Sequence, residues 1–102
     1  MSAQKTIDID SLPEFDPAKY LTSEAAIAAY LTDILDAGNA GLLAAALGDI
    51  ARARGMGEIA KSAGITREAL YKALRPDAQP RFETVSRVFA ALGVRLVAQP
   101  AA

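Results

Sequence analysis

The sequence predicts an all-α domain of five helices in residues 23–93, after an extended segment in residues 1–22 and before a short β-strand and tail in residues 94–102. Three observations predict this fold class. Apolar residues recur at spacings of three and four, which is the period of a helix with one buried face. The chain is rich in alanine and has only three Tyr, three Phe and no Trp, which suits small, closely packed helices. Glycines end the apolar stripes, and 102 residues suffice for one modest core.

The first predicted helix begins at Thr22 or Ser23, either of which can cap a helix. It ends at Gly38, and Asn39 begins the connection to the next helix. Its apolar stripe follows the i, i+3, i+4, i+7, i+8 pattern and comprises Ile27, Tyr30, Leu31, Ile34 and Leu35.

The second predicted helix runs from about Ala40 to Arg54 and has a wide apolar face. That face comprises Leu42, Leu43, Ala46, Leu47, Ile50 and Ala51. Gly48 lies inside the helix, where glycine is about 1 kcal/mol less favourable than alanine. We therefore expect another helix to approach closely at Gly48.

Residues 56–74 predict two short helices joined by a tight turn, with the residue types of a helix-turn-helix at the required offsets. Gly64 occupies the turn, where a left-handed backbone costs glycine little. Thr66 is a suitable N-cap for the second helix. The inward residues are Ile59, Ala60 and Ala63 on the first helix, and Ala69, Leu70, Ala73 and Leu74 on the second.

The outward side chains of the second short helix are of the types that read base edges when such a helix lies in the major groove. We predict base contacts from Arg67, Glu68, Tyr71 and Lys72. We predict phosphate contacts from Thr66, Arg75, Thr84 and Arg87. The same pattern also occurs on the solvated face of purely structural helical domains, so its context matters.

The last predicted helix follows a loop with proline at both ends and runs from Arg81 to Leu92, where Gly93 ends it. Its inward residues are predicted to be Phe82, Val85, Val88, Phe89 and Leu92. Residues 94–99 then read as a short strand. A lone strand cannot satisfy its own backbone hydrogen bonds, so it needs the same strand of a second copy or the sheet edge of another protein. The partner-strand residues are Val94, Arg95, Leu96 and Val97.

Charge is distributed unevenly along the chain, although the net charge is only −1. Residues 1–51 carry two lysines against eight acidic residues, a net charge of −6. Residues 52–87 carry eight basic and four acidic residues, a net charge of +4, and include the predicted helix-turn-helix. A local positive surface is what attraction to phosphate requires. A charge split of this kind also serves solubility alone.

Composition excludes several function classes. The chain has no Cys and no His, which excludes thiolate chemistry, disulfides, imidazole catalysis and the usual zinc sites. Paired acids such as Asp33 and Asp36 have no evident activating partner, so we expect neither an enzyme nor a cofactor. The sequence has no apolar run of membrane-spanning length and no signal-peptide pattern, which predicts a cytoplasmic protein without membrane association.

Several strings of residues together resemble the probable addiction module antidote proteins. The resemblance covers about residues 14–98 and rests on 15–21, 29–31, 50–56, 59–60, 66–74, 80–84 and 91–93. The strings Arg-Ala-Arg-Gly-Met and Arg-Glu-Ala-Leu-Tyr-Lys-Ala-Leu are specific in combination. Ala78-Gln79 stands where many members have Gly-Asn, and Gly64-Ile65-Thr66 where they have Gly-Leu-Ser, which affects the loops more than the fold.

The resemblance implies a Cro/C1-type helix-turn-helix antitoxin, related to HigA-like proteins, encoded beside a RelE/ParE-superfamily toxin. It would neutralise that toxin by direct binding and repress its own operon as a homodimer on an inverted-repeat operator DNA. The acidic half would complement a basic toxin surface. Candidate toxin contacts are Phe15, Asp16, Tyr20, Glu24, Asp33 and Asp36. Two alternatives stay open: a phage-type transcriptional regulator without a toxin partner, and a protein-interaction module that no longer binds DNA.

Overall fold

The computed structural model describes residues 23–101 and contains five α-helices and no β-strand in that range. The helices are α2 (Glu24–Asp36), α3 (Ala40–Arg54), α4 (Met56–Ala63), α5 (Arg67–Ala73) and α6 (Phe82–Ala91). The predicted all-helical class is therefore confirmed for the described residues, and the predicted C-terminal strand is not found in the single chain.

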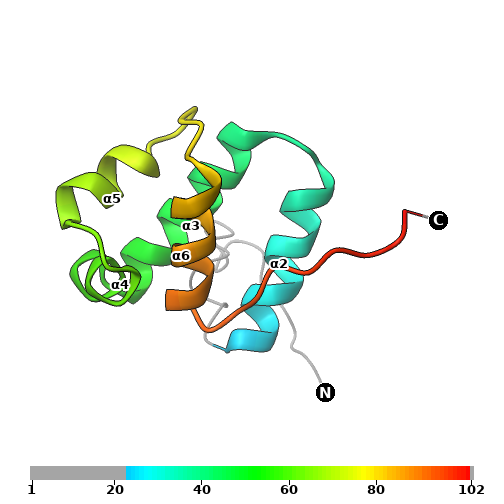
Figure 1. The fold of residues 1–102 in the computed structure, drawn as a ribbon, viewed down its shortest axis with the longest axis horizontal. Helices are drawn as coiled ribbons and strands as arrows, with labels where there is room; N and C mark the ends of the chain where they lie inside the picture. Colours follow the sequence, from blue (N-terminus) through cyan, green and yellow to red (C-terminus); the bar gives the residue numbers. More distant parts are fainter. Residues whose placement is uncertain (1–22, 102) are drawn as a thin grey trace, which may run out of the picture.

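Helix α3 packs against both α2 and α4. Helix α4 also packs against α5 and, most extensively, against α6. Figure 1 shows the short helices α4 and α5 at one end of the molecule and α2 at the opposite end. The α4–α5 pair is thus held by the core on one side and projects from it on the other.

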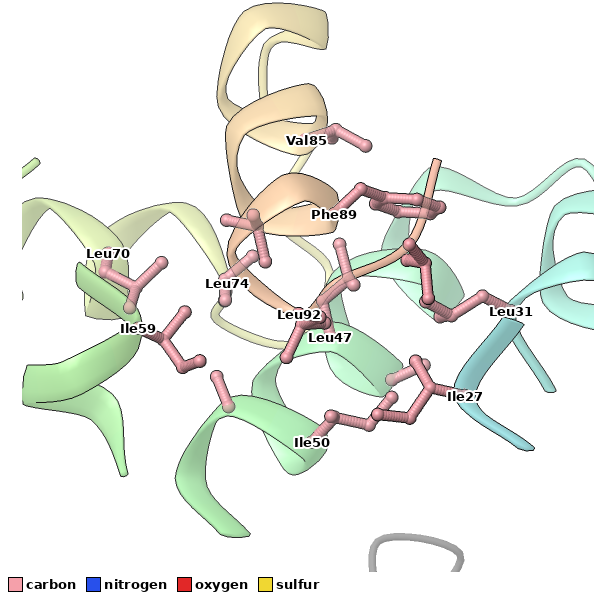
Figure 2. Packing of buried hydrophobic residues seen from close by; sticks show 14 of the residues in the cluster. Ile27, Leu31, Leu47, Ile50, Ile59, Leu70, Leu74, Val85, Phe89 and Leu92 are labelled. Atoms are coloured by element: carbon pink, nitrogen blue, oxygen red, sulfur yellow. The ribbon is translucent and has the colours of Figure 1, made fainter. Parts of the chain in front are cut away.

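The core is a single cluster of small and branched apolar side chains, as the alanine-rich composition suggests. Figure 2 shows side chains from all five helices converging on it. Its largest fully buried members are Ile27, Leu31, Leu47, Ile50, Leu70, Leu74, Val88 and Leu92. Leu70 and Leu74 belong to the α5 segment, so the outermost helix is anchored through two leucines one turn apart.

Side-chain caps define the starts of the first two helices. Ser23 Oγ accepts the amide hydrogen of Ala26 at 3.1 Å, which confirms the predicted start of α2. Asn39 Oδ1 accepts the amide hydrogen of Leu42 at 2.9 Å, so Asn39 caps α3 and does more than begin a connection.

Gly48 is buried in α3 beneath the C-terminal end of α5. A Cβ atom at this position would lie 2.9 Å from the carbonyl oxygen of Leu74 and 3.3 Å from the guanidinium nitrogens of Arg52. The close approach predicted from the sequence is therefore confirmed. The glycine gives up helix propensity so that the carbonyl group of Leu74, directly after α5, can lie close to α3.

We expect Gly48→Ala to lower the free energy of unfolding by about 1–3 kcal/mol, because a clash with backbone outweighs the gain of about 1 kcal/mol in helix propensity. Gly57→Ala in α4 is the matched control, since no described atom lies within 4 Å of an added Cβ there. We expect this control to gain up to about 1 kcal/mol. Urea denaturation of both variants measures the difference. A Gly48→Ala protein as stable as the wild type would contradict the proposed contact.

Some residues predicted to be inward are exposed in the structure. Phe82 is 75% exposed, because it continues the stripe of α6 in the helix's first turn, beyond the point where that stripe meets the core. Leu42, in the first turn of α3, is 43% exposed, and Leu35, in the last turn of α2, is 40% exposed, for the same reason. Ala69 is also exposed, since α5 turns only Leu70 and Leu74 fully inward.

The segment after α6 is extended but forms no strand, since no described segment pairs with its backbone. Val94 is buried, and its amide donates to the carbonyl oxygen of Phe89 at 3.0 Å. Leu96 packs partly against the core, whereas Val97 is 67% exposed. Figure 1 shows the segment crossing α2 toward the C-terminus. Within one chain, apolar contacts at two alternate positions therefore hold this segment against the helices.

Candidate nucleic-acid interface

The turn between α4 and α5 is a closed structural unit. Gly64 has φ +76° and donates its amide hydrogen to the Lys61 carbonyl oxygen at 3.2 Å, and the Ile65 amide donates to the Ala60 carbonyl oxygen at 3.0 Å. This pair of bonds is the Schellman arrangement, which satisfies the last carbonyls of a helix and favours glycine at the left-handed position. The predicted role of Gly64 is confirmed.

Thr66 starts α5 as predicted. Its Oγ1 accepts the amide hydrogen of Ala69 at 3.0 Å, and its carbonyl oxygen accepts from Leu70 at 3.0 Å. The hydroxyl hydrogen is not used in this cap, because a hydroxyl both donates and accepts. Thr66 can therefore cap the helix and donate to a phosphate oxygen at the same time, which leaves its predicted phosphate contact intact as a prediction.

The outward face of α5 carries the four predicted base-reading side chains, Arg67, Glu68, Tyr71 and Lys72, all of them exposed. The structure brings two of these side chains together. The Arg67 guanidinium carbon lies 5.5 Å from the centroid of the Tyr71 ring, and Arg67 Nη2 donates to the Tyr71 hydroxyl at 3.4 Å. That hydrogen bond is the main cause that raises the pKa of Arg67 above its usual value. The spacing i, i+4 was the only sequence signal for this contact.

The residues predicted to contact phosphate lie on different elements of the structure. Arg75 is exposed just after α5. Arg87 Nη2 donates to Glu83 Oε2 at 3.0 Å. The other terminal nitrogen of Arg87, Nη1, lies so close to Gly64 that a Cβ atom added there would be 3.5 Å from it. Helix α6 therefore brings this guanidinium to the α4–α5 turn. Thr84 is half-buried in the first turn of α6. Arg87 therefore lies next to the turn, while the structure records no such contact for Thr84.

The residues predicted to contact protein partners fall into two regions. Glu24, Asp33 and Asp36 are exposed on α2, whereas the other candidate toxin contacts, Phe15, Asp16 and Tyr20, lie outside the described residues. In the C-terminal segment the predicted partner-strand residues alternate: Val94 is buried and Leu96 half-buried, and Arg95 and Val97 are exposed.

A shallow groove of about 370 Å³ lies between α2 and the C-terminal segment. Its lining combines apolar residues such as Leu35, Phe89 and Leu96 with polar residues such as Thr32 and Asp36. Within residues 23–101, no group of three or more acidic side chains is placed to hold a metal ion. In the same range, each helix is too short or too polar to cross a bilayer.

Comparison with known proteins identifies a matching family and a relative of this chain. Residues 11–100 match the family described as "Probable addiction module antidote protein". A protein of Haemophilus influenzae, described as an "Uncharacterized protein", is 50% identical over 90 residues, which make up 88% of this chain and 93% of the relative. No solved structure matches the chain. Since the match spans the α4–α5 pair and nearly all of the sequence, the chain belongs to the family of probable addiction module antidote proteins.

Proposed function

We propose that this protein is the antitoxin of a type II toxin–antitoxin module, which binds and neutralises a RelE/ParE-superfamily toxin and represses its own operon. The membership of residues 11–100 in an antidote family carries the proposal, since an antidote implies a toxin. We assign the protein no enzymatic activity and no cofactor, and we place it in the cytoplasm, where operon DNA and a newly made toxin meet.

The DNA-binding part of the proposal uses α4 and α5 as a Cro/C1-type helix-turn-helix, related to HigA-like proteins. Its support is a short cationic helix whose buried side, Leu70 and Leu74, is locked in the core and whose outward side is exposed. Such a helix fits the major groove, where arginine can form two hydrogen bonds with guanine. A homodimer would present two copies of α5 about 34 Å apart and would require an inverted-repeat operator.

The toxin-binding part of the proposal uses the acidic half of the chain. Residues 1–51 have a net charge of −6, and the described part of this half exposes Glu24, Asp33 and Asp36 on α2, the helix farthest from α5 in Figure 1. RelE/ParE-type toxins are expected to present a basic RNA-binding surface, to which an acidic helix is complementary. This placement lets one antitoxin hold toxin and DNA on different surfaces.

Co-expression with the product of the adjacent gene tests the antitoxin function. We expect that product alone to stop growth, and we expect the tagged antitoxin to restore growth and to co-purify with it. Asp33→Lys with Asp36→Lys should weaken co-purification at least about tenfold, because two attractive charges become repulsive. Glu58→Lys on α4 is the matched control, since it reverses an exposed acid outside the acidic half.

A harmless neighbouring product that does not co-purify would contradict the antitoxin function and would favour a regulator without a toxin partner. Normal capture of the toxin by the Asp33→Lys, Asp36→Lys variant would move the contact away from α2.

A further inference from the structure

Arg67 differs from the other described arginines with a recorded side-chain hydrogen bond, because its hydrogen-bond partner is neutral. Arg52 pairs with Asp49 at 2.9 Å and Arg87 pairs with Glu83 at 3.0 Å, so an acid opposes each of these charges. Arg67 lies over the Tyr71 ring and uses one N–H on the hydroxyl. A guanidinium has five N–H donors, so Arg67 keeps its full charge and four donors while its position is restrained.

Tyr71 can restrain Arg67 because the two residues are four apart on α5 and therefore lie on the same helix face. Arginine is among the side chains that lose the most rotamer freedom when they are held in one place, up to about 2 kcal/mol. A side chain that is already restrained before binding loses less on forming its contacts. The Tyr71 ring stays 40% exposed, so part of its apolar edge is open to a ligand next to the guanidinium.

We propose that Arg67 and Tyr71 form one reading unit, in which Tyr71 positions the Arg67 guanidinium against a guanine while its ring covers the methyl group of a neighbouring thymine. The inference rests on the proposed DNA binding and adds which bases of the DNA these two side chains recognise. Guanine offers two acceptors in the major groove that match the arginine fork, and the thymine methyl is the apolar group exposed there. Because one of its roles is to hold Arg67 in place, Tyr71 is in that role a positioning residue.

In vitro selection from a pool of random DNA duplexes tests the unit with the full chain. The wild type should enrich half-sites that contain a guanine next to a thymine. Arg67→Ala should lose the preference for guanine. Tyr71→Leu should lose the thymine and weaken the preference for guanine, while Tyr71→Phe, which keeps the ring over the guanidinium, should retain both. Arg75→Ala is the control: as a phosphate contact, it should lower affinity without changing the selected sequence.

Binding affinity for duplexes that contain base analogues gives a second readout. Before this measurement, circular dichroism checks that the variants have unchanged helix content. Exchange of the guanine for 7-deazaguanine should weaken wild-type binding about tenfold, and the same exchange should weaken Tyr71→Leu binding about threefold or less. Exchange of the thymine for uracil, which lacks the methyl, should weaken binding by the wild type and by Tyr71→Phe about threefold or more, and should not affect Tyr71→Leu.

The reading unit alone is overturned by undiminished guanine discrimination in Tyr71→Leu, or by a selected sequence whose guanine does not depend on Arg67. Equal wild-type affinity for thymine and uracil would also overturn it. Failure of the wild type to enrich any sequence would instead refute the proposed DNA binding, and the reading unit with it, while leaving toxin capture untouched.

Discussion

At least about a tenfold loss of operator affinity is the expected result of replacing Arg67 and Lys72 together with alanine, since one well-formed base contact contributes about 1–3 kcal/mol. Both side chains lie on the exposed face of α5, and neither is part of the core that holds the helix. The fold should therefore persist while the contacts to DNA are lost. Gel-shift titration on the promoter of the protein's own operon, together with circular dichroism, measures both effects.

The matched control for this variant removes the same amount of charge elsewhere. Arg54→Ala with Arg95→Ala also deletes two exposed arginines, one at the end of α3 and one in the C-terminal segment. We expect this control to weaken binding about threefold or less, through the general attraction to phosphate that salt screens. Equal losses for the two variants would mean that charge alone drives binding, and unchanged affinity of the α5 variant would remove the assignment of this helix.

The second large effect is expected from Leu47→Ala in the central helix. Leu47 is fully buried, and Figure 2 shows its side chain in the middle of the core near Leu92. Truncating a buried leucine to its Cβ leaves a cavity that the packed surroundings fill only in part, so we expect a loss of about 2–5 kcal/mol in the free energy of unfolding. A domain of this size has about 5–15 kcal/mol in total, so the variant should lose a substantial share of its stability.

Leu42→Ala is the matched control, because it makes the same chemical change in the same helix at a position that is 43% exposed. We expect the control to differ from the wild type by about 1 kcal/mol or less. Urea denaturation followed by circular dichroism measures both variants. Similar losses at the two positions would show that Leu42 is covered in solution, for example by a second copy of the chain.

Local signals in the sequence predicted the helices and the α4–α5 turn well. The caps at Ser23 and Thr66 and the left-handed Gly64 depend on neighbours within five residues, so residue type alone carries the information. Gly48 was also predicted correctly, because an apolar face interrupted by glycine has few explanations other than close packing. The family resemblance drawn from short strings was confirmed by a match over residues 11–100.

The errors concern residues whose environment depends on distant parts of the chain. Phe82 fits the stripe of α6, yet whether the first turn of that helix meets another element depends on how the loop before it is folded. The C-terminal segment alternates like a strand, yet a strand exists only where a second segment supplies hydrogen bonds, and none of the described residues does so.

The sequence by itself therefore determined where the helices lie, how the turn before α5 is built and to which family the chain belongs, since these depend on short-range chemistry. Only the tertiary structure decided which parts of each apolar stripe are covered, that the Leu74 carbonyl group lies close to Gly48, and that Arg87 lies at the α4–α5 turn. It also decided that Arg67 lies on the Tyr71 ring and that, within residues 23–101, no carboxylate lies within ion-pair distance of its guanidinium. These features depend on side-chain rotamers and on helices packed across long loops, which a one-dimensional pattern of residue types does not contain.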